Sequence, residues 1–259
     1  MDDLISRFDL FCKEVCEVNR YFYSDDTNQF LDDLYKYITG SSKGITKLLP
    51  CGTSFYRARA HDFINTDNAY SSTPFEPEDM KPIPNIRANG RLNAYNINAL
   101  YLSYNKSTAI SEARANAEAP VSVAEFKSNK DLTVIRFDYS SNVSCWSTYF
   151  DRDITFTLAH RFSQPLDNPQ HQSREYIPTQ IISEFLKSKG IDGIEYPSQF
   201  ISLHEADIKD EAIAELLKTK NRFNLCLFDM SSADCDPASI EVLKLIKRVN
   251  IISTYKKNT

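Results

Sequence analysis

An arginine, a tyrosine and a glutamate stand within 22 positions of one another, each where it could do chemistry. Arg91 follows Gly90 in a predicted turn, Tyr101 lies inside the apolar segment 100–102, and Glu112 lies on a half-apolar helical segment. A guanidinium pairs with a pyrophosphate through parallel hydrogen bonds, and a phenol offers an aromatic ligand a flat face and a polar tip. A carboxylate on a half-apolar helix face costs desolvation energy unless it is paired or used.

Each of these residues also has an ordinary structural explanation. Arg91 fits a salt bridge in a loop, Tyr101 fits the core, and Glu112 fits a solvated helix position. The order of the surrounding motifs favours the functional interpretation. These motifs are YR at 56–57, GRLN at 90–93, LYLS at 100–103, TAISEAR at 108–114, YIPTQ at 176–180, DGIEYPS at 192–198 and NLCLF at 224–228.

Taken in this order, the motifs resemble the RES domain family, which is named for an arginine, a glutamate and a serine. The resemblance covers roughly residues 53–230. It implies an α+β, ADP-ribosyltransferase-like fold with a mixed or antiparallel β core. It also implies an NAD-degrading toxin of a toxin–antitoxin pair, which cleaves the nicotinamide–ribose bond by hydrolysis or phosphorolysis. NAD is then the substrate, and the implied partner is an antitoxin of the Xre type.

The resemblance also assigns roles by position. It implies that Arg91, Tyr101 and Glu112 are catalytic. It implies that NAD is bound by Arg57, Tyr56 and Ser198 together with Arg91 and Tyr101. We expect the arginines to hold the two phosphates and Glu112 to stabilise positive charge on the ribose as nicotinamide leaves.

Some positions depart from the family pattern. Leu92 replaces an aromatic residue, and Ala94, Tyr95 and Asn96 stand where many relatives carry proline and glycine. These changes affect the expected shape of the loop more than its chemistry. We expect Asn93 and Gln180 to support the wall of the site, and Arg59 and Arg114 to form surface or structural ion pairs.

Two other functions remain open. The chain could be an ADP-ribosyltransferase that modifies a protein or a nucleotide, or a catalytically inactive NAD-binding or interaction module. A nuclease of the helical type is disfavoured, because its Arg–His pair separated by four to six residues does not occur here.

The elements that must position these residues divide the chain into three parts. Apolar residues at helical spacing predict two helices over residues 1–40, within an N-terminal extension of residues 1–50. The RES domain is expected over 51–230, with short strands, a long proline-rich loop over 61–89 and a helix over 178–189. Further helices are predicted over 209–218 and over 237–249, the latter in a C-terminal helical tail (231–259) packed on the domain.

Composition and charge disfavour several classes of protein. The 259 residues are 42% hydrophobic and 25% charged, which is typical of a globular protein. The formal net charge of −5 disfavours direct nucleic-acid binding. We find neither a membrane-spanning stretch nor a secretory signal, which predicts a cytoplasmic protein. The six cysteines form no metal-ligand spacing, so we expect them to be reduced, mostly buried and without a metal.

Overall fold

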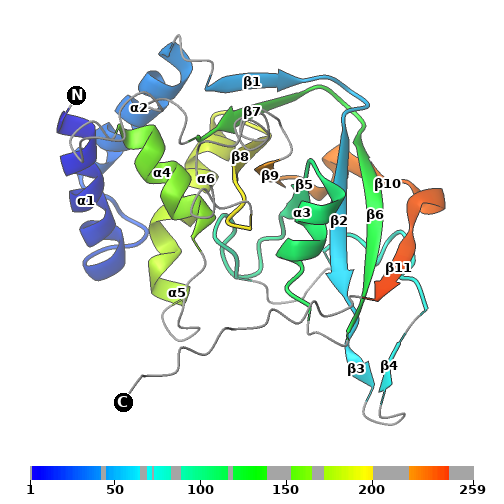
Figure 1. Cartoon of the computed structure of the whole chain (residues 1–259). Coiled ribbons are helices and arrows are strands. Elements are labelled where there is room, and N and C mark those ends of the chain that lie inside the picture. The colour runs from blue at the N-terminus through cyan, green and yellow to red at the C-terminus, as the bar shows by residue number, and fades with distance from the viewer. Residues whose placement is uncertain are drawn as a thin grey trace, which may run out of the picture.

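A strongly twisted sheet of nine strands forms the centre of the described part of the chain (Figure 1). The computed structural model describes residues 2–41, 45–64, 69–71, 73–82, 89–115, 119–138, 153–164, 172–200 and 222–244. In Figure 1, strands β1 and β7 run across the view, whereas β2 and β6 run down it. The sheet therefore turns through a large angle from one edge to the other, as twisted sheets do.

The sheet is mixed. Its order is β1 (Thr46–Leu49), β7 (Leu132–Arg136), β8 (Gly193–Pro197), β9 (Phe223–Leu227), β5 (Leu100–Ser103), β2 (Ser54–Ala60), β6 (Pro120–Ser128) and β10 (Ala233–Cys235), and β11 (Glu241–Lys244) also pairs with β6. Strands β7 and β8 are parallel, and the other pairs are antiparallel. The predicted α+β class with a mixed sheet is confirmed. A two-stranded hairpin, β3 (Phe63–Ile64) and β4 (Ala69–Tyr70), stands apart from it.

Side-chain alternation along β9 shows how the sheet divides two apolar layers. Cys226 faces a layer of helices, whereas its neighbours Leu225 and Leu227 face the opposite side, where Phe55 and Met80 pack. All three β9 side chains are buried. Because both faces of the central strands are covered, the segment reads as a continuous apolar run in the sequence.

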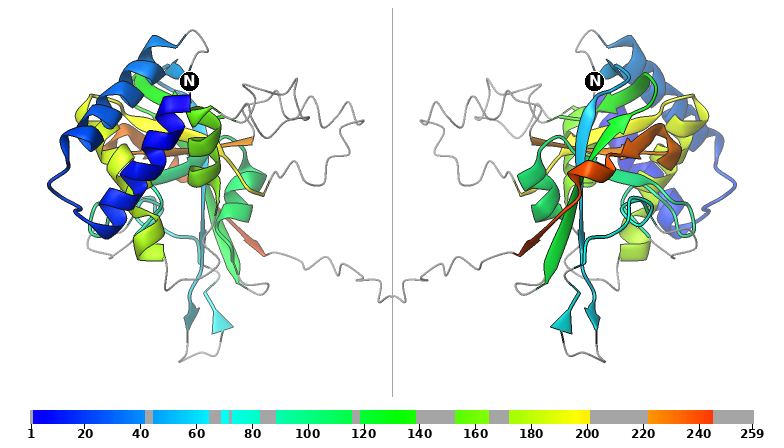
Figure 2. Two further views of the ribbon diagram at one scale, coloured as in Figure 1. Left: turned by 90° about the vertical axis from the view of Figure 1, so that its left-hand side faces the viewer. Right: turned by 90° about the vertical axis from the view of Figure 1, so that its right-hand side faces the viewer.

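Helices cover one face of the sheet in two tiers. The helices α4 (Ile154–Ser163) and α6 (Ile177–Ser188) lie against the sheet, and α1 (Asp2–Glu17) and α2 (Asp25–Gly40) pack outside them (Figure 2). A four-residue helix, α5 (Gln172–Glu175), precedes α6. A short helix, α3 (Lys106–Glu112), lies beside β2 and β5.

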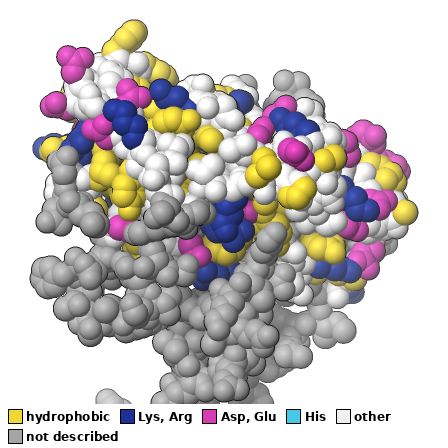
Figure 3. All heavy atoms as spheres, turned by 90° about the horizontal axis from the view of Figure 1, so that it is seen from above, with side chains coloured by type: hydrophobic (Ala, Val, Ile, Leu, Met, Phe, Trp, Pro, Cys, Tyr) yellow, Lys and Arg dark blue, Asp and Glu magenta, His cyan; other side chains and the backbone are white. Residues whose placement is uncertain are grey.

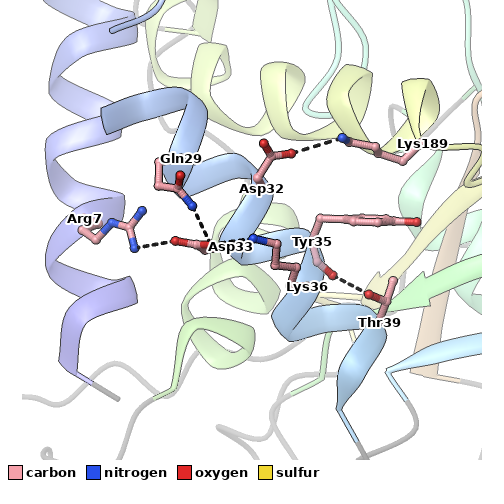
Figure 4. A network of polar contacts seen from close by, with 8 residues as sticks. All are labelled: Arg7, Gln29, Asp32, Asp33, Tyr35, Lys36, Thr39 and Lys189. Atoms are coloured by element: carbon pink, nitrogen blue, oxygen red, sulfur yellow. Dashed lines mark hydrogen bonds and ion pairs between the residues drawn. The ribbon is translucent and has the colours of Figure 1, made fainter. Parts of the chain in front are cut away.

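The two predicted N-terminal helices are confirmed. Ser24 caps α2, since its side chain accepts a hydrogen bond from the Thr27 amide. The residues predicted to face inward are buried: Phe30, Leu31, Leu34 and Ile38. Polar contacts fix the outer surface, where Asp33 accepts from Arg7 and Gln29, and Asp32 pairs with Lys189, just beyond the end of α6 (Figure 4).

The helix predicted over 237–249 is wrong for its described part. Residues Pro237–Ser239 form a 3₁₀ turn, and β11 follows it. The reason lies in β6, whose outer edge is paired with β10 only at 126–128, whereas β11 pairs with 120–123. Unpaired strand edges carry backbone groups that need partners, and this requirement outweighs the helical spacing of apolar residues. The helix predicted over 209–218 lies outside the described residues.

The surface seen from above carries a mixture of charges. Acidic and basic side chains alternate there with apolar ones on the described residues (Figure 3). No helix in the described ranges is long and apolar enough to cross a membrane. The five described cysteines are free thiols, as predicted, but Cys51 is exposed and Cys226 alone among them is fully buried.

Candidate functional site

Four polar side chains form a row across the helix-covered face of the sheet. Tyr56 of β2 is in register with Ser103 of β5, Ser103 with Asn224 of β9, and Asn224 with Tyr196 of β8. Residues opposite one another on antiparallel strands share a face and lie next to each other. Tyr101, two residues before Ser103, lies on the same face opposite Cys226.

Glu112, the last residue of α3, hydrogen-bonds to Asn224 of this row. Its Oε1 accepts a hydrogen bond from Ser198 Oγ at 2.7 Å and one from Asn224 Nδ2 at 2.6 Å. Ser103 Oγ donates to Asn224 Oδ1 at 2.6 Å, so the amide is fixed from both ends. The structure thus brings together the two predicted residues Glu112 and Ser198, which are 86 positions apart in the chain.

The helix α3 delivers Glu112 to this cluster. Asn105 caps its first turn, with Oδ1 accepting from the amides of Ser107 (2.8 Å) and Thr108 (3.3 Å). The helix ends at Glu112, and Arg114 then takes a positive φ of 47°. A carboxylate at a helix C-terminus is disfavoured by the helix dipole, so the donors from Ser198 and Asn224 offset this cost.

The turn at 89–93 wraps the tip of Tyr101. The phenol donates to Asn93 Oδ1 at 2.7 Å and accepts from the Leu92 amide at 3.1 Å. Gln180 of α6 donates to the carbonyls of Gly90 (2.7 Å) and Asn93 (3.1 Å). The supporting role predicted for Asn93 and Gln180 matches these contacts, because both hold the turn that presents Arg91.

Arg91 is anchored on α4. Its Nη1 donates to the carbonyls of Phe162 (2.8 Å) and Ser163 (2.7 Å) at the C-terminal end of that helix, where a cation is favoured. The guanidinium carbon lies 5.9 Å from the centre of the Tyr196 ring. Burial lowers the pKa of Arg91, but Tyr196 and Glu112 more than offset this, so that its pKa is raised. Arg91 therefore carries a fixed positive charge within electrostatic reach of Glu112.

Arg57 fills the place where β2 and β5 separate. The two strands pair at a single register position, Tyr56 with Ser103, and beyond it Arg57 Nη1 donates to the Tyr101 carbonyl at 2.9 Å. Its Nε is buried with no hydrogen-bond partner among the described residues. Burial, helped by the charge of Arg59, lowers the pKa of Arg57 to about 10, which leaves it charged at neutral pH.

Tyr196, which is buried, and Tyr101, which is partly buried, both stay neutral beside Arg91. Burial is the main reason that the pKa of Tyr101 is raised well above its ordinary value of 10.0, with Cys226 and Tyr196 adding to it. Burial likewise raises the pKa of Tyr196, against the opposing charge of Arg91. Both phenols can therefore donate hydrogen bonds but do not act as bases at neutral pH.

The two remaining arginines make other contacts. Arg59 and Arg114 were expected to form ion pairs, but the contacts found are different. Arg59 donates to the Asp79 carbonyl and lies 4.4 Å from the centre of the Phe75 ring. Arg114 lies 5.7 Å from the centre of the Phe200 ring. The described residues contain no group of three His, Cys, Asp or Glu side chains that could hold a metal ion.

Two features of the site were missed from the sequence. Asn224 and Ser103 belong to the quoted motifs, and strand alternation would have placed Ser103 on the face of Tyr101, whereas the face of Asn224 also depends on the register of β9 against β5. On the opposite face, the fully buried Glu195 accepts hydrogen bonds from Tyr104 and Arg136. The signal for this buried Glu195–Arg136 ion pair was a glutamate in the middle of the apolar segment 194–196.

Comparison with known proteins gives the class of protein. A family model, the RES domain, matches residues 54–237, which is most of the chain. The chain therefore belongs to the RES domain family. None of the curated proteins compared with it matches. Among solved structures, it is similar to a chain of the M. tuberculosis MbcT–MbcA toxin–antitoxin complex, with 11% identity and a TM-score of 0.37, over 76% of this chain and 86% of that one.

Proposed function

We propose that this chain is an NAD-degrading toxin that cleaves the bond between nicotinamide and ribose, by hydrolysis or phosphorolysis. One observation carries the proposal: the Glu112 carboxylate is held by Ser198 and Asn224, with the fixed cation Arg91 within electrostatic reach. Membership of the RES domain family supports it.

The proposed roles follow from charge. As nicotinamide leaves, positive charge develops on the ribose, and a nearby carboxylate stabilises that charge. Arg57 and Arg91 bind the diphosphate, for which a guanidinium offers paired donors. Tyr101 contributes its ring face to the nicotinamide, and Tyr56 and Ser198 contact the dinucleotide. Because pyridinium is already a good leaving group, this reaction needs no metal.

The biological setting belongs to the same proposal. An enzyme that destroys NAD in the cytosol harms its own cell unless a partner blocks it. We therefore propose an antitoxin of the Xre type as the partner. The proposed function involves no direct binding of nucleic acid or membrane.

Product analysis tests the proposal. Purified protein is incubated with NAD, with and without inorganic phosphate, and the products are separated by chromatography and identified by mass spectrometry. We expect nicotinamide together with ADP-ribose, or with its 1″-phosphate when phosphate is present. Nicotinamide that appears only after a protein or nucleotide acceptor is added would favour the ADP-ribosyltransferase, and NAD binding without any product would favour the inactive module.

The charge of Glu112 is tested separately. In Glu112→Gln, the amide oxygen can still accept from Ser198 and Asn224, so the fold is kept while the negative charge is lost. We expect nicotinamide release to fall by about 10²- to 10³-fold, the effect of removing one electrostatic contact to a transition state. The matched control is Glu184→Gln at an exposed position of α6, which should leave the rate unchanged. A Glu112→Gln enzyme as fast as the wild type would refute the assignment.

A further inference from the structure

The hydrogen bonds to Glu112 are asymmetric. Ser198 and Asn224 both donate to Oε1, at 2.7 Å and 2.6 Å. No described residue donates a hydrogen bond to Oε2. A carboxylate held by one oxygen in this way keeps the lone pairs of the other oxygen for a different partner.

The amide of Asn224 is itself fixed. Ser103 Oγ donates to Asn224 Oδ1 at 2.6 Å, which orients the amide nitrogen toward Glu112. Ser103 and Asn224 are each 3% exposed, so water does not compete for these contacts. Both come from paired strands in the centre of the sheet, which makes them a rigid support.

Glu112 needs such a support because of its place in the chain. It is the last residue of a helix of only seven residues, and short helices fray at their ends. The dipole of α3 also disfavours a negative charge there. The backbone alone therefore does not fix the direction of this carboxylate.

We propose that Ser103 and Asn224 are positioning residues, which hold the Glu112 carboxylate so that Oε2 faces the reacting ribose. This inference rests on the proposed cleavage of NAD. Ser103 orients Asn224, Asn224 holds Oε1, and Oε2 stabilises the positive charge. Among the described residues, Arg91 from the turn at 89–93 and Tyr196 of β8 interact electrostatically with Glu112.

Removal of the support should lower turnover more than binding. In Asn224→Ala, we expect kcat for nicotinamide release to fall roughly 100-fold, as for a catalytic group displaced by about 1 Å, with KM for NAD changed by less than about threefold. Ser103→Ala should lower kcat about tenfold, the value of one hydrogen bond. The controls are Asn129→Ala, which removes an amide's hydrogen bond to the Asp234 carboxylate, and Ser183→Ala, which removes a buried hydroxyl's hydrogen bond to the Thr179 carbonyl.

The pH profile separates positioning from a structural role. Asn224→Asp keeps the size of the side chain but places a second carboxylate against Glu112, and such a pair shares one proton until the pH is raised well above the ordinary carboxyl pKa. While the pair shares a proton, the introduced carboxyl group can donate a hydrogen bond as the amide does. We therefore expect the variant to approach the wild-type rate at low pH and to lose activity as the pH rises, whereas Asn129→Asp keeps the wild-type profile.

The outcomes distinguish the two proposals. A wild-type protein that releases no nicotinamide overturns the proposed function and this inference with it. An active wild type whose Asn224→Ala variant keeps its kcat overturns the inference alone. Asn224→Ala is also made in the Glu112→Gln background. If it lowers kcat there by the same factor as in the wild type, the inference is overturned, because Asn224 would then act without Glu112.

Discussion

At the scale of single residues, Gly90 stands where a side chain does not fit. A Cβ atom there would lie 2.2 Å from Asn93 Oδ1 and 2.4 Å from the Tyr101 hydroxyl oxygen. Gly90→Ala should therefore push the turn away from Tyr101 and displace Arg91. We expect the variant to lose about 1–3 kcal/mol of unfolding free energy, as overpacked sites do, and to release nicotinamide more slowly. Urea unfolding and product analysis measure the two effects.

Gly40 provides the matched control. A Cβ at this position, at the end of α2, would meet no atom within 4 Å. Gly40→Ala should leave nicotinamide release unchanged and should not lower stability, since alanine is the better helix former. If the two alanine variants behave alike, the tight turn is not what positions Arg91.

Tyr101 should make the protein sensitive to alkali. Its pKa is raised in the folded state by burial, so the native protein keeps the phenol proton that the unfolded chain loses above about pH 10. The stabilisation is complete below that pH and falls as the pH rises toward the folded pKa, by about 1.4 kcal/mol per pH unit. Between about pH 8 and pH 11, the wild type should lose more unfolding free energy than Tyr101→Phe. Equal losses in urea titrations would contradict this.

The sequence predicted the residues proposed for the chemistry of the candidate site, but not the residues that hold them in place. Motif order predicted the residues Arg91, Tyr101, Glu112 and Ser198, and the structure places Ser198 and Glu112 in direct contact. The importance of Asn224 and Ser103 was not predicted. Their contacts depend on the register of β5 against β9, and register is a property of pairing between distant segments.

At the scale of elements, the cap of α3 links stability to the site. Asn105 accepts two hydrogen bonds from the first turn of this helix, whose last residue is Glu112. Asn105→Ala should cost about 1 kcal/mol of unfolding free energy and slow nicotinamide release. Asn105→Asp retains an acceptor that caps well and should behave like the wild type. An alanine variant as stable and active as the wild type would show that α3 does not depend on its cap.

Elements were predictable where local pattern and tertiary pairing agree. The helices over 1–40 have clear helical spacing, and they form. Strand β11 was mistaken for a helix because Ile240 and Leu243 are three residues apart, which is also helical spacing. The free edge of β6 decides between the two, and no local pattern reveals it.

At the scale of the whole molecule, the N-terminal helices and the sheet share one core. Phe30 of α2 is 1% exposed and stacks on Phe11 of α1, with ring centres 5.1 Å apart, in the same apolar cluster as Phe162 and Tyr196. Phe30→Ala should cost about 3–5 kcal/mol and lower the stability of the entire chain in one transition. Circular dichroism and tyrosine fluorescence should report the same midpoint.

The matched control for this prediction lies on α1. Leu10 is 68% exposed, so Leu10→Ala removes a similar volume from the surface and should change the unfolding free energy by less than about 0.5 kcal/mol. An early transition confined to the N-terminal helices in Phe30→Ala would show that they unfold independently of the sheet.

The sheet is least continuous between β2 and β5, which pair at a single register position. On one side, β2 forms a long ladder with β6, and β10 and β11 pair with the outer edge of β6. On the other side lie β1, β7, β8, β9 and β5, in that order. Within the sheet, one residue pair and the Arg57 side chain join these halves, and the apolar cluster that holds Phe55 and Phe126 with Leu100 and Leu225 packs across the junction. Because backbone bonds are fewest at this junction, side-chain packing rather than a strand ladder sets how the two halves lie against each other. Tyr56 and Arg57 lie on one side of this junction and Tyr101 and Ser103 on the other, so the geometry of the candidate site depends on the packing of that apolar cluster.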